Sequence, residues 1–394
     1  MRRSSTAVTY ASLADECFNG SPVARGAVDA TIALGCFGFA TSYLIVIGGL
    51  MPQVAEMLCG STPRICGAAA PLLQSRQLWI TALGGGVGLP LMCASSLDAL
   101  RFSSVVGNLG AVFIVLVTCA FALGLLPLPH APLAPVSYEP TLRPPYTSVA
   151  GMVECVSIFF FAFSCAQNLP SLAHELRDAT PRRLAAMVAA GIAISALMYQ
   201  LTAWCGATAF GASVDANLLR SFPVHGGALV GAVGTVARVA VVLNVGGGFP
   251  LNMHPARTSL SGLVFGRPPS ELDRRRWAAL TGGLFFASWL LAVAIESLDT
   301  AMAFIGGTTA LAMNFLFPAA FYIVLHSPRR SSAPMMSAVE ESAYTLFESH
   351  SKEAPRATST ATLRGAQALV VMVVVMMPVI VGLAVWKLLR SGEA

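Results

Sequence analysis

Residues Ile158–Arg183 read IFFFAFSCAQNLPSLAHELRDATPRR. An apolar run enters this stretch and then gives way to hydroxyl, thiol and amide side chains immediately before Leu169 and Pro170. Proline has no backbone N–H, and its ring clashes with the carbonyl four residues earlier, so a helix cannot pass this point unperturbed. In a bilayer, backbone groups released in this way are tolerated only where they are buried in protein or line a cavity. The stretch is therefore a candidate ligand site if the chain lies in a membrane.

The composition predicts an integral membrane protein. Hydrophobic residues make up 55% of the 394 residues, charged residues make up 11%, and the mean hydropathy is +0.70. Soluble domains contain about 25% charged residues. A helix needs roughly 20 apolar residues to cross the hydrocarbon core of a bilayer. We expect nine such spans, near residues 28–51, 78–97, 104–127, 149–170, 184–205, 226–251, 278–296, 299–325 and 366–389.

The distribution of basic residues predicts the orientation of these spans. If the first residues are cytosolic and nine spans alternate, most of the 24 Lys and Arg fall on the cytosolic side, as the positive-inside rule requires. The net charge of +5 then reflects topology and does not indicate nucleic-acid binding. No apolar signal-peptide core follows Arg2 and Arg3. We expect a cytosolic connector at 1–26, a transmembrane core at 27–326, a flexible cytosolic linker at 327–364, and a final helix with a short tail at 365–394.

The cysteines and the charged residues do not indicate a metal site or an enzyme. Most of the nine cysteines stand singly inside apolar spans, without CxxC or His/Cys ligand spacing, so we expect no metal and no cofactor. Cys59 and Cys66, in the predicted outer loop CGSTPRIC, either form a disulfide or remain free thiols. Paired carboxylates, HExxH and a GxSxG motif with a plausible triad are all missing from the sequence, which argues against an enzyme.

A second unusual segment, Ala237–Leu260, reads ARVAVVLNVGGGFPLNMHPARTSL. So many helix-breaking residues in the cytosolic half of one span predict a backbone that lines something. Asn244, Gly248 and His254 are candidates for ion coupling or gating. The unperturbed imidazole pKa of about 6.5 suits proton exchange, but His254 could equally be an interfacial residue without a chemical role. Glu175, which follows the first stretch, could close an inner gate or form a surface ion pair.

Three segments in order resemble the amino acid/auxin permease family of secondary transporters. They are FFFAFSCAQNLPSLAHEL at 159–176, FPLNMHPAR at 249–257 and LDTAMAFIGGTTALAMNFLFPAAFYI at 298–323. The resemblance extends from about Tyr10 to the last span, and the glycine-rich, short-linked style looks most like the members found in trypanosomatid protozoa.

The resemblance implies the inverted-repeat transporter fold of the APC superfamily. That fold has eleven spans in two five-helix repeats, and its first and sixth helices are broken around a central amino acid site. YASLADECFNG at 10–20 resembles the family's connector after the second span. The nine spans would then match family spans three to eleven. The first two, which include one of the broken helices and half of the binding site, are absent from this sequence.

In the family the sixth helix contacts the substrate, and Phe161–Asn168 occupy its place here. The resemblance therefore implies these substrate-binding residues: Phe161, Phe163, Ser164, Cys165, Gln167 and Asn168. In sodium-coupled relatives, a hydroxyl residue precedes the proline of the eighth helix. Here Gly246, Gly247, Gly248 and Phe249 stand at that place. We therefore expect proton-coupled or uncoupled transport in place of sodium coupling.

The sequence thus predicts amino acid transport across a membrane by alternating access, impaired if the missing helices are essential. The alternative is a nutrient sensor or regulatory membrane protein that keeps the transporter fold and does not transport. The expected partners are an amino acid, protons and the lipid bilayer, with no nucleic acid; the oligomeric state stays open. The plasma membrane is the default location, and an intracellular membrane is the alternative.

Overall fold

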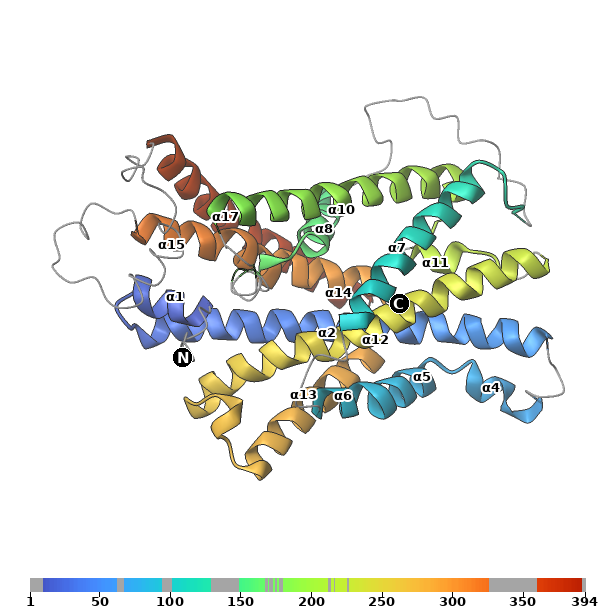
Figure 1. Ribbon diagram of the computed structural model, residues 1–394, viewed down its shortest axis with the longest axis horizontal. Coiled ribbons are helices and arrows are strands. Elements are labelled where there is room, and N and C mark those ends of the chain that lie inside the picture. The colour runs from blue at the N-terminus through green and yellow to red at the C-terminus, as the bar shows by residue number, and fades with distance from the viewer. Residues whose placement is uncertain are drawn as a thin grey trace. The chain divides into compact units, whose positions relative to one another are not determined.

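The computed structural model describes residues 10–61, 67–93, 101–128, 149–166, 169, 173, 176, 180–211, 214–215, 217–224, 227–325 and 360–391. Within these residues every regular element is a helix (Figure 1). The chain forms two compact units, each assembled from separate stretches of sequence. Unit 1 contains Met1–Ile32, Val149–Ser195 and Ala303–Ala394, and unit 2 contains Ala33–Ser148 and Ala196–Met302.

Unit 1 contains the interrupted segment quoted above. Its complete helical elements are α1 (Tyr10–Cys17), α8 (Val149–Ala162), η7 (Gly306–Ala310), η8 (Ala312–Leu316), α15 (Phe317–Leu325) and α17 (Thr360–Ser391). It also includes the first residues of α2 (Pro22–Ser61), the first half of α10 (Pro181–Phe210) and the end of α14 (Leu298–Ile305). The elements η7 and η8 are π-helical turns, a form that often occurs at functional sites.

Short helix α1 is tied to both α2 and α15. The guanidinium of Arg25 in α2 lies 2.9 Å from the carboxylate of Asp15 in α1 and 3.9 Å from that of Asp29 one turn further along α2. Tyr10 and Phe18 place their ring centroids 6.3 Å and 6.2 Å from that of Phe321 in α15. From residue 10 onward, the segment predicted as a cytosolic connector therefore consists of α1, a short turn and the start of α2, all within unit 1.

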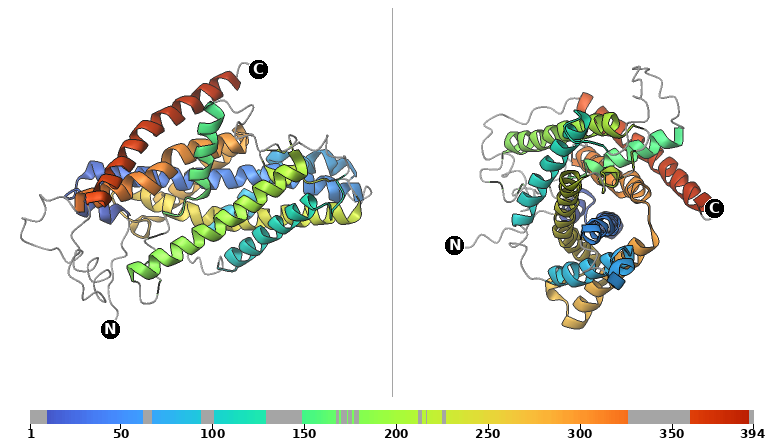
Figure 2. Two further views of the ribbon diagram at one scale, coloured as in Figure 1. Left: turned by 90° about the horizontal axis from the view of Figure 1, so that it is seen from above. Right: turned by 90° about the vertical axis from the view of Figure 1, so that its right-hand side faces the viewer.

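The core of unit 1 depends on close helix approach. Buried Leu311, Val373 and Ile380 join the π-helical segment to α17, which also runs beside α15 (Figure 2). A Cβ at Gly306 would overlap the carbonyl oxygen of Ser157 in α8. Glycine is therefore required at 306, because any side chain there would push α8 away.

Unit 2 contains the remaining helices. They are the rest of α2, η1 (Gly67–Ala69), α4 (Ala70–Leu73), α5 (Arg76–Leu83), η2 (Gly84–Gly88), α6 (Leu89–Cys93), α7 (Arg101–Ala122), the second half of α10, α11 (Leu218–Ser221), α12 (Ala228–Phe265), η6 (Pro269–Glu271), α13 (Arg274–Ala294) and the first residues of α14. Helix α7 crosses α12 (Figure 1) and approaches it closely, because a Cβ at Gly110 would lie 3.1 Å from the Ala240 side chain.

Helix α12 is longer than the predicted span. The sequence predicts a span near 226–251, and α12 runs for 38 residues, from Ala228 to Phe265, through both Pro250 and Pro255. Each proline removes one backbone hydrogen bond, whereas a full break in hydrocarbon would leave several backbone groups unpaired at several kcal/mol each. The Asn252 amide also donates to the Gly248 carbonyl at 3.1 Å. A continuous helix therefore costs less free energy than a full break.

A helix occurs at each of the nine predicted spans, and within the described part of the chain seven helices are long and apolar enough to cross a membrane. Helix α8 is a shorter apolar helix, and the segment near 78–97 consists of α5, η2 and α6. The prediction of an all-helical, multi-pass membrane protein is confirmed. The count of nine spans stays a prediction. Most of the predicted linker at 327–364 lies outside the described residues.

For Cys59, the structure decides between the two predicted alternatives, a disulfide and a free thiol. Cys59, near the end of α2, is disulfide-bonded. Its expected partner Cys66 lies outside the described residues. The seven other cysteines are free thiols.

Candidate functional site

The interrupted segment begins where α8 ends. The backbone N–H of Phe163 still donates to the Phe159 carbonyl at 3.0 Å, as in a helix, but that of Ser164 turns to the Phe161 carbonyl at 3.1 Å. The Phe160 carbonyl thereby loses its helical donor. Buried backbone carbonyls need a replacement donor, and here the side chain of Asn314 supplies it.

Asn314, on the π-helical segment η8, has two hydrogen bonds to the end of α8. Its Nδ2 donates to the Phe160 carbonyl at 3.4 Å, and its Oδ1 accepts from the Ser164 hydroxyl at 3.4 Å. Both distances exceed the usual 2.7–3.2 Å, so the contacts are weak. An amide and a hydroxyl held this loosely can exchange partners with a polar ligand at little cost. Asn314 lies 150 residues from Ser164 in the sequence.

The two threonines of η7 do not share this arrangement. Thr308 and Thr309 are buried, and their hydroxyls donate to helical carbonyls, at 2.6 Å to Phe304 and at 3.3 Å to Ile305. Such bonds satisfy the hydroxyls within their own helix. Asn314 is therefore the polar side chain of this helix that contacts the interrupted segment.

The other predicted substrate residues differ in their surroundings. Phe161 and Phe163 are half-buried, and Cys165 is an exposed free thiol. Burial raises the pKa of Tyr10 on α1 to about 12, and the Cys165 thiol adds to the rise. The sequence did not predict this electrostatic influence of the interrupted segment on α1. Gln167, Asn168 and Glu175 lie outside the described residues.

In unit 2, His254 is paired with a cation. The Arg257 guanidinium donates through Nη2 to His254 Nδ1 at 2.9 Å. Because arginine can only donate, Nδ1 accepts, and a neutral His254 ring has its proton on Nε2. Arg257 also donates through Nη1 to the Met92 carbonyl at 3.1 Å and to the Thr281 hydroxyl at 3.2 Å. The spacing of three residues on one helix face is a signal for this pair that was present in the sequence.

The remaining two candidates of α12 pack against neighbouring helices. A Cβ at Gly107 in α7 would overlap the Asn244 side-chain amide. A Cβ at Gly248 would lie 2.8 Å from the ring of Tyr43 in α2. These positions therefore set how closely α7 and α2 approach α12. The structure places Asn244, Gly248 and His254 on one helix of unit 2, whereas Ser164 and Asn314 belong to unit 1.

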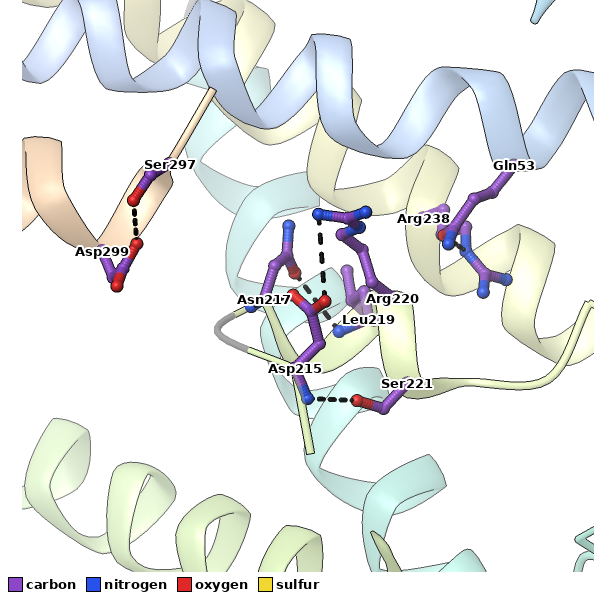
Figure 3. Close-up of polar contacts among 9 residues, drawn as sticks. All are labelled: Gln53, Asp215, Asn217, Leu219, Arg220, Ser221, Arg238, Ser297 and Asp299. Atoms are coloured by element: carbon purple, nitrogen blue, oxygen red, sulfur yellow. Dashed lines mark hydrogen bonds and ion pairs between the residues drawn. The ribbon is translucent and has the colours of Figure 1, made fainter. Parts of the chain in front are cut away.

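Arg238 is a buried charge that holds three elements of unit 2 together. It is 1% exposed, and it donates through Nε to the Gln53 side chain at 2.8 Å and through Nη2 to the Phe222 carbonyl at 2.6 Å (Figure 3). A charged group within a span is costly unless it has such partners. Arg238 therefore joins α12 to α2 and to the residue after α11.

The loop around α11 has its own polar contacts, also shown in Figure 3. The Asn217 side chain caps α11 by accepting from the Leu219 N–H at 3.2 Å, and the Asp215 N–H donates to the Ser221 hydroxyl at 2.8 Å. The Asp215 carboxylate also lies 3.8 Å from the Arg220 guanidinium. These contacts hold the loop in place and do not form a ligand site. In the described residues, no cluster of three metal-ligating side chains occurs.

Comparison with known proteins yields a family and several relatives. The profile of the family described as "Transmembrane amino acid transporter protein" matches residues 2–340. The chain is 28% identical to "Vacuolar amino acid transporter 5" of Schizosaccharomyces pombe, over 75% of this chain and 65% of that protein. It is 22% identical to "Vacuolar amino acid transporter 6" of Saccharomyces cerevisiae, over 79% of this chain and 75% of that protein.

A plant relative is similarly distant. The chain is 26% identical to "Amino acid transporter AVT6B" of Arabidopsis thaliana, over 79% of this chain and 68% of that protein. The alignment with the Schizosaccharomyces pombe protein thus spans somewhat less than two thirds of that relative. No solved structure matches the chain.

Proposed function

The chain belongs to the family of transmembrane amino acid transporter proteins, the amino acid/auxin permeases, and on that premise we propose that it moves amino acids across a membrane by alternating access. This is a family of transporters and not of enzymes, as expected from the sequence. The proposal includes the inverted-repeat fold of the APC superfamily, in which the nine helical segments correspond to family spans three to eleven.

One observation carries the proposal. Helix α8 ends at Ala162, within an apolar segment, and a weakly held set of polar groups gathers at that end: the Ser164 hydroxyl, the Asn314 amide and the Phe160 carbonyl. The C-terminal end of a helix carries partial negative charge, which favours a cationic group such as the ammonium of an amino acid. Phe161 and Phe163 supply apolar surface beside this end. We propose that the substrate binds here, with Cys165, Gln167 and Asn168 as further contacts.

The proposal for coupling is proton-coupled or uncoupled transport. The absence of a hydroxyl residue before Pro250 argues against a sodium site at that place. The pair of His254 and Arg257 supplies a proton-sensitive contact, because a protonated ring cannot accept a hydrogen bond from Arg257. Asn244 and Gly248 would transmit such a change to α7 and α2, which they contact. We also propose that Glu175 acts as a gate residue.

The names of two relatives favour a location on an intracellular, vacuole-like membrane over the plasma membrane. The alternative function, a non-transporting sensor, would use the same amino acid site without moving its ligand. The two functions differ in a single measurable property, which is the net flux of the amino acid.

Uptake of radiolabelled amino acids into proteoliposomes tests the proposed function. We expect uptake above that of protein-free liposomes, and we expect Ser164→Phe to abolish it because the ring would fill the space beside Asn314. Ala193→Phe, on an exposed face of α10 in the same unit, is the matched control and should retain uptake. If no amino acid is taken up but one binds with an affinity that Ser164→Phe lowers, the sensor function replaces transport.

A further inference from the structure

Two free thiols from distant parts of the sequence meet in unit 2. The Sγ atoms of Cys119 on α7 and Cys205 on α10 are 3.3 Å apart, although 86 residues separate them in the chain. Both side chains are half-buried. At this distance one thiol donates a weak hydrogen bond to the other. No step of the proposed transport uses this pair.

Side chains next to the thiols also approach one another. Next to Cys205, a Cβ at Gly206 would lie 3.2 Å from Leu218 and 3.9 Å from Thr118, which neighbours Cys119. Further along, the rings of Phe121 and Phe210 lie 5.7 Å apart between centroids. These approaches show that α7 and α10 come near one another at this level.

The geometry requires only a small movement for a covalent bond. A disulfide has an S–S length of about 2.05 Å, so the sulfurs at 3.3 Å must approach by about 1.2 Å, or about 0.6 Å each. Side-chain rotation about the Cα–Cβ bonds can supply such a shift.

The position of the pair along the helices fits an oxidising side of the membrane. Both cysteines lie within about two turns of the C-terminal ends of their helices, at Ala122 and Phe210. The orientation expected from the basic residues places these ends, and the end of α2, on the non-cytosolic side. Cys59 at the end of α2 is already disulfide-bonded. Disulfides form and persist in such oxidising compartments and are rare in the cytosol.

We propose that Cys119 and Cys205 are a redox modification site, in which a peroxide oxidises the two thiols to an intramolecular disulfide and a dithiol reduces it back to two thiols while itself becoming a disulfide. One thiol loses its proton, and its sulfur attacks a peroxide oxygen, which gives a sulfenic acid and one water. The second thiol attacks the sulfenic sulfur, the S–S bond forms, and a second water leaves. Two thiols and one hydrogen peroxide thus give one disulfide and two waters. The bond fixes the end of α10 to α7.

Counting reactive thiols before and after oxidation tests the proposal. The full-length protein in detergent has its three exposed free cysteines replaced through Cys93→Ser, Cys155→Ser and Cys165→Ser. It is treated with hydrogen peroxide, cleared of peroxide with catalase, denatured, and labelled with a polyethylene glycol maleimide that shifts the gel band once per thiol. We expect peroxide to remove two labels per chain and dithiothreitol to restore both, beyond the labels that dithiothreitol releases from the Cys59 disulfide in untreated protein.

Single variants provide the matched controls. Cys119→Ser and Cys205→Ser, each in the same background, should show no peroxide-dependent loss of label that dithiothreitol reverses. In each variant the remaining cysteine of the pair has no partner thiol. An unchanged label count in the parent protein would overturn the proposal, and so would the same reversible loss in either single variant. In the unmodified chain, mass spectrometry of a non-reducing peptic digest should detect a linked peptide pair containing both cysteines. A digest in which Cys205 is linked instead to another cysteine would contradict the assignment.

Discussion

Gly306→Ala should damage both the stability and the activity of the protein, because Gly306 sets the distance between α8 and the π-helical segment. A Cβ there would overlap the Ser157 carbonyl oxygen and lie 2.8 Å from its carbonyl carbon and 3.1 Å from the Phe161 Cβ. Ordinary carbon–oxygen contacts are about 3.3–3.6 Å, so the two segments would have to part by more than about 1 Å. The clash is with backbone, which cannot rotate away as a side chain could.

The magnitude follows from this displacement. Overpacking of a close-packed interior typically costs about 1–3 kcal/mol of stability. The same movement would break both hydrogen bonds of Asn314, which are already 3.4 Å long. Misplacement of a binding group by about 1 Å can cost roughly 100-fold in rate. We therefore expect a lower unfolding temperature in detergent and uptake reduced by about two orders of magnitude.

Gly365→Ala is the matched control. Gly365 lies in α17 of the same unit, and a Cβ there would meet no atom within 4 Å. Alanine is favoured over glycine inside a helix by about 0.5–1 kcal/mol, so this variant should be at least as stable as the original protein and fully active. If Gly306→Ala unfolds at the same temperature and transports as fast as Gly365→Ala, the proposed role of the α8 contact is wrong.

Three further predictions concern polar side chains. Asn314→Leu should lower uptake by about 10-fold or more. Asn314→Asp should lose the donor to the Phe160 carbonyl but keep the acceptor for the Ser164 hydroxyl. Equal activity of the two variants in an uptake assay would contradict this division of roles. Arg238→Met should destabilise the protein by about 3 kcal/mol because it leaves two buried acceptors unpaired, and an unchanged thermal midpoint would refute this. Uptake should rise as the pH falls from about 8 to about 5.5, because protonation of the His254 ring breaks its contact with Arg257. The rise should vanish in His254→Ala, and identical uptake across the range would argue against proton coupling.

The sequence located the helices because a bilayer constrains them strongly. A span must be about 20 residues long and must satisfy its own backbone hydrogen bonds, so apolar runs are read directly as helices. The interruption after α8 was predictable for the same reason, from a proline behind a polar cluster. The length of α12 was not, because Pro250 and Pro255 remove only single hydrogen bonds from a helix that otherwise continues.

The site itself was only half predictable. Ser164 stands out in the sequence because it interrupts an apolar run, but nothing local connects it with Asn314, 150 residues away. That pairing depends on how α8 packs against the π-helical segment. This packing is possible only because residue 306 is a glycine and has no side chain. By contrast, the pair of His254 and Arg257 lies on one helix with a spacing of three residues and could have been predicted from the sequence.

The central claim is that an amino acid binds where α8 is interrupted, and alkylation of Cys165 tests it most directly. Cys165 is an exposed free thiol next to Ser164, and Cys155 is an exposed free thiol in the preceding helix α8. The reaction of N-ethylmaleimide with each cysteine is followed by mass spectrometry in the presence of individual amino acids. We predict that at least one amino acid slows the alkylation of Cys165 several-fold and leaves that of Cys155 unchanged. If no amino acid alters the rate at Cys165, the site is not where we place it.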